Sequence, residues 1–236
     1  MAEMSLFMRM KTIYKMVGSI GLMFLLVAGC REAPSSSASE VGAEPRRGEA
    51  DDRPVVLFVG DSLTAGYQLD PADAYPALIQ SKIDVVGGSH RVVNAGVSGD
   101  TSADGRNRID WLLRQPVDVF VLALGANDAL RGLPIHQLRD NLTTILEATR
   151  SRHPEARLVI AGMRMPTNYG ETYTRAFEQV FRDVANTFDA NLIPFLLEGV
   201  GGNPALNLAD GIHPNEAGHR VIAETVWHQI APLLAD

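Results

Sequence analysis

The chain has 236 residues, of which 46% are hydrophobic and 21% charged, and its formal net charge is -7 at pH 7. This length and balance are typical of one globular domain with its own hydrophobic core. The acidic charge disfavours nucleic-acid binding, which needs clustered lysine and arginine against phosphate. Cys30 is the only cysteine, so an intramolecular disulfide is excluded.

The first residues have the pattern of a bacterial signal peptide. Three basic residues at positions 9–15 precede an uncharged, mostly apolar run at 16–28, which is too short to cross a bilayer comfortably. Residues 26–30 read Leu-Val-Ala-Gly-Cys and resemble the lipobox of bacterial lipoproteins, in which the cysteine is lipidated and becomes the mature N-terminus. We therefore expect residues 1–29 to be a lipoprotein signal peptide and Cys30 to carry the lipid.

Two alternatives to the lipoprotein remain open, an ordinary secretory signal with an incidental cysteine and a short membrane anchor. We expect the protein to lie on the periplasmic side of the bacterial cell envelope, where a lipid anchors it to a membrane. The alternative is a soluble periplasmic or secreted protein. Residues 30–53 contain a serine-rich stretch, prolines and mixed charges, which predict a flexible linker. Residues 54–236 are then the folded domain, expected to be a monomer.

The first predicted strand carries the most informative residues. Val55–Val59 is an uninterrupted apolar run, which predicts a buried strand of a parallel sheet, and Gly60 ends it. Asp61 and Ser62 follow where a helix would begin, at the sheet edge where open parallel sheets form their ligand crevice. Such residues often only cap a helix, so this stretch alone leaves capping and chemistry equally open.

Strands and helices alternate through the rest of the chain. Apolar runs predict four further strands, at 90–97, 117–124, 157–161 and 191–195, with the strand at 117–124 central in the sheet. Helical spacing predicts helices between them and at the C-terminus: one with Ile109, Trp111, Leu112 and Leu113 on its buried side, one through Leu138–Thr149, one through Tyr173–Val184, and a last one opened by Pro214.

This alternation predicts a three-layer α/β/α domain with a five-stranded, mainly parallel, doubly wound sheet. Right-handed crossovers place the loops that follow the strands on one edge. Ser62, Gly96 and Asn127 each follow or end a strand, so we expect them together there.

A second constellation lies near the C-terminus, in Asp210-Gly211-Ile212-His213-Pro214. An aspartate three residues before a histidine can accept the imidazole Nδ1–H and leave the other ring nitrogen to take a proton. On its own the pair is an ordinary turn before a helix. With Ser62 it becomes a candidate nucleophile, base and orienting acid.

These blocks resemble those of the SGNH, or GDSL, hydrolase family. Gly60-Asp61-Ser62-Leu63 is similar to the serine motif of the family, and Gly96 is similar to its glycine. Asn127, in Gly125-Ala126-Asn127-Asp128, is similar to the asparagine of the family. Asp210-x-x-His213 is similar to its histidine motif. The blocks occur in order over the whole body from Val55. Within the family the chain looks most like bacterial multifunctional thioesterases that are also lysophospholipases and arylesterases.

The resemblance implies a flavodoxin-like fold and hydrolysis of carboxylic esters or thioesters of lipophilic acyl groups through an acyl-enzyme. Ser62 is then the nucleophile, His213 the base and Asp210 its orienting acid. The oxyanion is held by the backbone N–H of Ser62 and of Gly96 and by the Asn127 amide. No cofactor or metal is expected, and the partners are a small acyl ester or thioester and, through Cys30, a membrane.

Loop residues near this edge are expected to line the acyl pocket: Leu130, Arg131, Met163 to Pro166 and Tyr169. Carbohydrate O-deacetylation is the nearest alternative activity. Two alternatives are more distant. One is a metal-dependent phosphoesterase with Asp61, Asn127, Asp210 and His213 as metal ligands. The other is a non-catalytic envelope lipoprotein.

Other polar residues are expected to have structural roles or none. Asp61 should shape the turn before Ser62, and Asp128 should be a hydrogen-bond partner within the fold. His219 is expected at the surface of the last helix. His90, His136, His153 and His228 have no acid or nucleophile beside them in the sequence.

Overall fold

The computed structural model describes residues 51–234. The signal peptide expected at 1–29, the lipidated Cys30 and all but the end of the linker at 30–53 lie outside the described residues. Within residues 51–234, no helix is both long enough and apolar enough to cross a bilayer.

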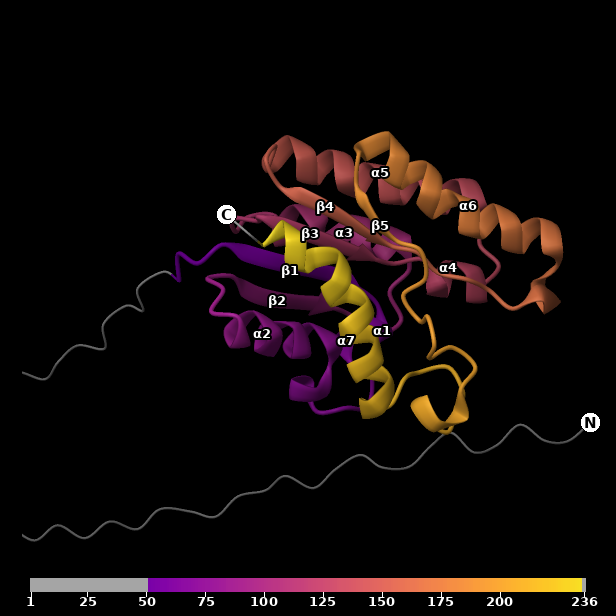
Figure 1. Ribbon diagram of the computed structural model, residues 1–236. Helices are drawn as coiled ribbons and strands as arrows, with labels where there is room; N and C mark the ends of the chain where they lie inside the picture. Colours follow the sequence, from indigo (N-terminus) through magenta and orange to yellow (C-terminus); the bar gives the residue numbers. More distant parts are fainter. Residues whose placement is uncertain (1–50, 235–236) are drawn as a thin grey trace, which may run out of the picture. The chain divides into compact units, whose positions relative to one another are not determined.

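The centre of the fold is a parallel sheet with the strand order β2-β1-β3-β4-β5 (Figure 1). The chain leaves β1 to one side for β2, then returns to the other side for β3, so the order reverses between β1 and β3. Ligand crevices form at such a reversal, outside the carboxyl ends of the strands. The predicted three-layer architecture with five parallel strands is confirmed, and the strands are β1 (Val55–Gly60), β2 (Arg91–Gly96), β3 (Val119–Ala123), β4 (Arg157–Ala161) and β5 (Asn191–Ile193).

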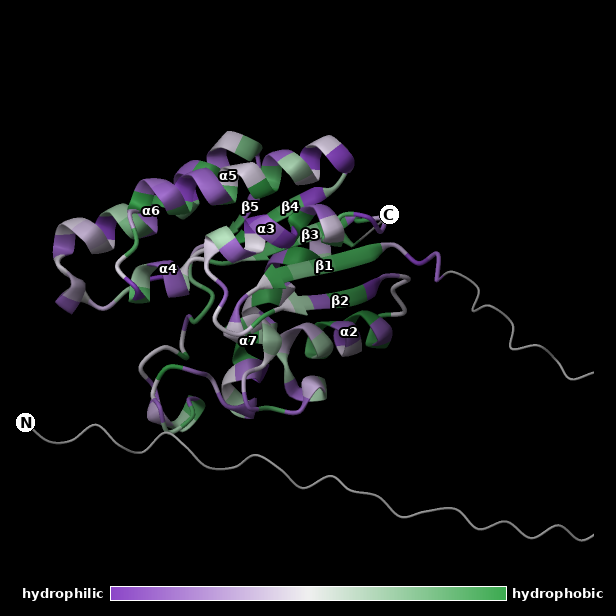
Figure 2. Cartoon of the chain, turned by 180° about the vertical axis from the view of Figure 1, so that it is seen from behind, coloured by the Kyte–Doolittle hydropathy of each residue, from purple (hydrophilic) through white to green (hydrophobic). Residues whose placement is uncertain are grey.

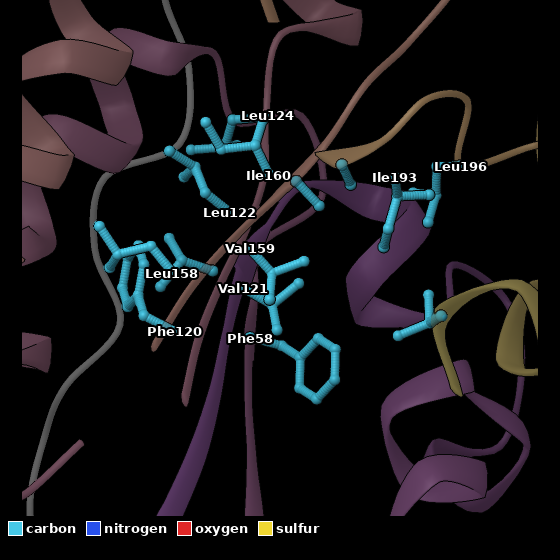
Figure 3. Packing of buried hydrophobic residues seen from close by; sticks show 14 of the residues in the cluster. Phe58, Phe120, Val121, Leu122, Leu124, Leu158, Val159, Ile160, Ile193 and Leu196 are labelled. Carbon is cyan, nitrogen blue, oxygen red and sulfur yellow. The ribbon is translucent and has the colours of Figure 1, made fainter. Parts of the chain in front are cut away.

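The inner strands are uninterrupted apolar runs because they are covered on both faces. Every residue of β1 and β3 is buried. Phe58 of β1 pairs with Val121 of β3, which pairs in turn with Val159 of β4, so these side chains form one row across the sheet. Figure 3 shows this row on one side of the strands and Phe120 with Leu158 on the other.

Helices cover both faces of the sheet. Helices α2 (Tyr75–Val85) and α7 (Glu216–Ile230) pack together on one face, and α3 (Ser102–Leu112), α5 (Ile135–Arg152) and α6 (Glu171–Phe188) on the other (Figure 1). Seen from behind, the sheet is largely hydrophobic and the outer parts of α5 and α6 are largely hydrophilic (Figure 2). The remaining helices are short: α1 (Ser62–Ala65), α4 (Ala126–Leu130) and the 3₁₀ turns η1 (Pro71–Asp73), η2 (Thr167–Tyr169), η3 (Pro204–Leu206) and η4 (Ala231–Leu233).

Some local predictions were wrong. Trp111 was placed on the buried side of α3, but it is 66% exposed, because a residue two positions after the buried Ile109 points to another side of the helix. Helix α7 begins at Glu216 rather than at Pro214, since the Asn215 side chain accepts the Gly218 N–H and caps the helix there.

Two histidines have partners that the sequence did not reveal. His90 precedes β2, and its Nε2 lies 2.7 Å from Oδ2 of Asp118, which precedes β3. This pair therefore lies at the amino edge of the sheet, opposite the loops that follow the strands. His219 was expected at the surface but is 1% exposed, and its Nδ1 accepts the N–H of Tyr75 at 3.1 Å.

The contact of His219 replaces a missing helix cap. The residue before α2 is Ala74, which has no side-chain acceptor for the first N–H groups of the helix. The His219 ring, on α7, supplies that acceptor and so joins the two helices. Burial lowers the pKa of His219 to about 4, against a smaller raising effect of Asp73. The imidazole is therefore neutral at pH 7.

We predict that this histidine makes the fold sensitive to acid. Its folded-state pKa lies below its ordinary value of 6.5, so between these values the unfolded chain binds the proton and folding stability falls as the pH falls. Relative to His219→Asn, which does not titrate, the wild-type free energy of unfolding should drop by about 2 kcal/mol between pH 7 and pH 5.

Urea unfolding of both proteins at the two pH values measures this difference. Other titrating groups, the buried Asp61 among them, are present in both proteins and cancel in the comparison. Equal pH slopes for the two proteins would contradict the prediction.

Candidate active site

Ser62 is the first residue of α1, directly beyond the carboxyl end of β1. The Asp61 carboxylate accepts the Leu63 N–H at 3.0 Å and so caps this short helix, which confirms the expected turn-shaping role of Asp61. Gly60 allows the turn to be tight, because a Cβ there would lie 2.0 Å from Oγ1 of Thr64. The Ser62 side chain is thereby held at the sheet edge where the strand order reverses.

His213 connects Ser62 to Asp210. Its Nε2 lies 3.0 Å from the Ser62 Oγ, and its Nδ1 lies 2.7 Å from Oδ2 of Asp210. Hydrogen bonds from the His213 main chain, the His213 ring and the Ile212 main chain lower the pKa of Asp210 to about 2. An ionised carboxylate only accepts hydrogen bonds, so Nδ1 carries the ring proton and Nε2 is left to accept the serine hydroxyl. The Tyr67 ring packs against the imidazole, with centroids 4.3 Å apart.

Asn127 lies in α4, which follows β3, and borders the same cleft as Ser62. Its Nδ2 donates to the main-chain carbonyl of Asp100 at 2.9 Å. An amide nitrogen carries two hydrogens, so one of them remains for another acceptor. The structure thus brings together four of the predicted residues: Ser62, Asn127, Asp210 and His213.

Arg108, which the sequence analysis missed, links the turn that carries Ser62 (the serine turn, residues 60–62) to the loop after β2 by hydrogen bonds. Arg108 of α3 donates from Nε to Asp100 Oδ2 at 2.8 Å and from Nη2 to the Gly60 carbonyl at 3.1 Å. The same carbonyl accepts the Val97 N–H at 3.0 Å. The segment from Val97 to Asp100 is therefore fixed between the start of the serine turn and Asn127.

Gly96 is not placed as the sequence analysis expected. Its N–H donates to Oδ1 of Asn94 at 2.9 Å, so it is already paired. A Cβ on Gly96 would lie 2.3 Å from the backbone nitrogen of Ala65, so a glycine here lets β2 pack against α1.

Within the described residues, Gly99 offers an unpaired main-chain donor on the same loop. It lies inside the fixed segment with a φ of +89°, and its carbonyl accepts Nη2 of Arg131 at 2.8 Å. No hydrogen bond engages its N–H within residues 51–234. In the sequence it lies three residues after Gly96, in Ser98-Gly99-Asp100, and the sequence analysis did not select it.

Two buried aspartates near the site differ in their surroundings. Burial raises the pKa of Asp61 to about 7, although the Leu63 N–H opposes this effect. Asp128 accepts both the main-chain N–H and the hydroxyl of Ser102, at 2.8 and 2.5 Å, which is the structural role expected for it.

A cleft of about 480 Å³ opens beside Ser62 and His213. Leu130, Pro166 and the neighbouring Met163 and Met165 line it as expected, whereas Arg131 and Tyr169 do not. The sequence analysis missed the part of the wall that comes after β5, which includes Phe195, Leu197 and Ile212. The lining is mainly apolar, so the cleft suits a hydrocarbon chain that ends at the serine.

In the part of the chain that the structure describes, the side chains near Ser62 are not arranged around a metal ion. No group of three or more His, Cys, Asp or Glu side chains is arranged to hold an ion there. The side chains considered as metal ligands are engaged otherwise: Asp61 caps α1, Asn127 donates to Asp100, and Asp210 and His213 bond each other.

Comparison with known proteins gives consistent matches over the folded part of the chain. Residues 58–221 match the GDSL-like lipase/acylhydrolase family. Over 180 residues the chain is 42% identical to "Esterase TesA" of Pseudomonas aeruginosa, covering 76% of this chain and 89% of that protein. It is 39% identical to "Thioesterase 1/protease 1/lysophospholipase L1" of Escherichia coli, with coverage of 76% and 84%.

Solved structures agree with these matches. The psychrotrophic esterase EstA from Pseudoalteromonas, in a structure inhibited by monoethylphosphonate, has a TM-score of 0.72 and 29% identity, with 77% of this chain and 99% of that chain covered. The similarity therefore extends over almost the whole described fold.

Proposed function

Because the chain belongs to the GDSL-like lipase/acylhydrolase family, we propose that it is a serine hydrolase that cleaves carboxylic esters or thioesters of lipophilic acyl groups. The observation that carries this proposal is the continuous hydrogen-bonded series from Ser62 Oγ through His213 to Asp210, with distances of 3.0 and 2.7 Å. A hydroxyl, a base and an orienting carboxylate in this order form an activated nucleophile.

The reaction follows from this series. Ser62 Oγ attacks the acyl carbonyl while His213 Nε2 takes the hydroxyl proton, and Asp210 stabilises the imidazolium that forms. His213 then returns the proton to the leaving alcohol or thiol as the acyl-enzyme forms. Water, activated by the same nitrogen, cleaves the acyl-enzyme and regenerates Ser62. The protein is therefore an esterase, with thioesterase, lysophospholipase and arylesterase activities as its expected range.

Three donors are proposed for the oxyanion of the tetrahedral intermediate. They are the main-chain N–H of Ser62, the second amide hydrogen of Asn127 and the N–H of Gly99, which takes the place expected for Gly96. Arg108 and Asn127 both hold Asp100, so they fix the Gly99 peptide before substrate arrives. Donors that are already fixed need no reorganisation when charge develops on the oxygen.

The cleft favours an acyl chain over a sugar. Its walls are built from Met163, Met165, Pro166, Phe195 and Leu197, which offer few hydrogen bonds to hydroxyl groups. Carbohydrate O-deacetylation therefore stays the second candidate activity.

We also propose lipid anchoring through Cys30, on the periplasmic side of the cell envelope. The support is the lipobox pattern at residues 26–30, which precedes the described residues. The intact mass of the membrane-extracted protein tests this: an unmodified Cys30 would refute it. The oligomeric state is proposed to be a monomer.

Hydrolysis of p-nitrophenyl esters of increasing acyl length by the full chain in detergent tests the proposed function. We expect turnover that rises from acetate to medium-length chains, persists with a chelator present and stops after phosphonate treatment. Turnover confined to acetate would favour the deacetylase. Loss of activity with the chelator would favour a metal-dependent hydrolase over the serine mechanism, and no turnover at all would favour a non-catalytic lipoprotein.

A further inference from the structure

The imidazole of His213 is held by a loop rather than by a helix or a strand. His213 lies between β5 and α7, and its side chain is 20% exposed. Its two ring nitrogens bond Ser62 and Asp210. The N–H and the lone pair of an imidazole point within the plane of the ring, so these two bonds do not restrain its faces. A base that tilts away from the hydroxyl loses its hydrogen bond, so the faces of this ring need contacts of their own.

Tyr67 covers one face of this ring. The two ring centroids lie 4.3 Å apart, with 38° between the ring planes. Tyr67 does not line the cleft, so it contacts the base rather than the space for the substrate. Among the described residues, the hydroxyls of Tyr75 and Tyr173 are hydrogen-bonded, whereas that of Tyr67 has no partner. The contact with His213 therefore depends on the aromatic ring of Tyr67 and not on its hydroxyl.

The backbone fixes Tyr67 directly to the serine. The Ser62 carbonyl accepts the N–H groups of both Gly66 and Tyr67, each at 3.1 Å. Gly66 ends α1 with a φ of +76°, and Gln68 after Tyr67 has a φ of +61°, which is uncommon for a residue with a side chain. Such conformations cost free energy and persist where the surrounding structure holds them, often beside functional sites. The short helix that carries the hydroxyl thus also carries the ring that meets His213.

The contact suits a ring that gains a positive charge during the reaction. His213 becomes an imidazolium when it takes the proton of Ser62. The face of an aromatic ring is its negative part, and it attracts a cation within about 6 Å of its centroid. The attraction is stronger for the imidazolium than for the neutral imidazole. An interaction that strengthens as the transition state forms raises kcat rather than tightening substrate binding.

We propose that Tyr67 is a positioning residue for His213. Its ring keeps the imidazole directed at Ser62, and its π face stabilises the imidazolium. This inference rests on the proposed hydrolase function. The proton moves from Ser62 Oγ to His213 Nε2 and then to the leaving group, and Tyr67 exchanges no proton and forms no bond. Phenylalanine should therefore replace it, whereas an aliphatic side chain of similar bulk should not.

Three substitutions separate the ring from the hydroxyl and from simple bulk: Tyr67→Phe, Tyr67→Leu and Tyr67→Ala. Trp111→Ala is the control, because Trp111 is also an exposed aromatic residue, lies on α3 and does not line the cleft. Each full chain in detergent is assayed for kcat and KM with p-nitrophenyl butyrate. The rate constant for inactivation by an alkyl p-nitrophenyl phosphonate is measured in parallel, because that reaction also needs the activated serine.

We expect Tyr67→Phe and Trp111→Ala to stay within about twofold of the wild type. Tyr67→Leu should lower kcat about fivefold and Tyr67→Ala about twentyfold, since alanine also frees the imidazole to tilt. KM should change less than about twofold, and the inactivation rate constant should fall in step with kcat. Unfolding temperatures should stay within a few degrees. Full activity of Tyr67→Leu, a loss in Tyr67→Phe equal to that in Tyr67→Ala, or a change in KM alone would each overturn the proposal.

A proton resonance tests the position of the ring without any turnover. The proton on His213 Nδ1, which is bonded to the ionised Asp210, gives a far-downfield NMR signal, assigned by its absence from His213→Gln. We expect this signal to be sharp in the wild type and in Tyr67→Phe, and broadened by exchange with water in Tyr67→Ala. Equal line widths would overturn the positioning role. If no ester is hydrolysed, the proposed function fails, and the line widths still decide what Tyr67 does.

Discussion

Replacement of Ser62 by alanine is expected to lower kcat for acyl ester hydrolysis by about 10⁵-fold. The substitution removes the oxygen that is positioned to attack the carbonyl, and the proton acceptor at 3.0 Å loses its partner. Removing the nucleophile of a comparable serine–histidine–aspartate group costs roughly 10⁴ to 10⁶ in kcat, with the residual rate coming from the oxyanion donors and substrate binding.

The same variant separates chemistry from folding. The Ser62 hydroxyl pairs with His213 alone in the described structure, so its loss should leave the unfolding temperature within a few degrees of the wild type. Ser81→Ala is the control, because the Ser81 hydroxyl on α2 donates only to the Ala77 carbonyl and is remote from the cleft. A stoichiometric phosphonate adduct should form on the wild type and on Ser81→Ala, and be absent from Ser62→Ala. Wild-type turnover by Ser62→Ala would remove the proposed mechanism.

Replacement of Asp210 by asparagine is expected to lower kcat by about 10³-fold. The asparagine can present its amide hydrogens to His213 Nδ1, which favours the tautomer whose Nε2 carries the proton and cannot accept the serine hydroxyl. In a serine protease with a buried carboxylate the equivalent change costs about 10⁴-fold. Asp210 is more accessible, at 38% exposed, so water can partly replace it.

The pH profile distinguishes this role from a proton-transfer role. The pKa of Asp210 lies at about 2, so the carboxylate stays ionised at every pH at which the protein is assayed. Asp210→Asn should therefore reduce kcat at all pH values above about 4, rather than remove one limb of the profile. Asp183→Asn, on the outer surface of α6, is the matched control. A loss confined to one limb would contradict the orienting role of Asp210.

The strands were predictable because burial on both faces leaves a continuous apolar run, as in β1 and β3. Positions that depend on contacts between distant segments were not predictable. The buried His219 accepts the N–H of Tyr75, 144 residues earlier, and His90 pairs with an aspartate 28 residues away. A single helix or strand, read alone, contains no trace of either partner.

In the active site, too, some residues were predictable from the sequence and others were not. The residues of the catalytic series could be proposed from short motifs, because the chemistry fixes their types. The main-chain donor of the oxyanion could not, because two glycines lie close together, Gly96 at the end of β2 and Gly99 just after it. Only their hydrogen bonds separate them, since the N–H of Gly96 is used by Asn94. Arg108 left no signal either, because its contacts are with a carboxylate and a carbonyl on two other segments.

The chain separates Ser62 from His213 by 151 residues, and this distance has a consequence for the time before folding is complete. During synthesis the serine emerges early, whereas its base emerges shortly before α7, close to the end of the chain. Until α7 docks on α2 and brings the imidazole to the sheet edge, Ser62 is an ordinary alcohol with no reactivity toward esters. A nascent or truncated chain is therefore harmless to the lipids around it, and hydrolysis becomes possible only once the whole domain has closed.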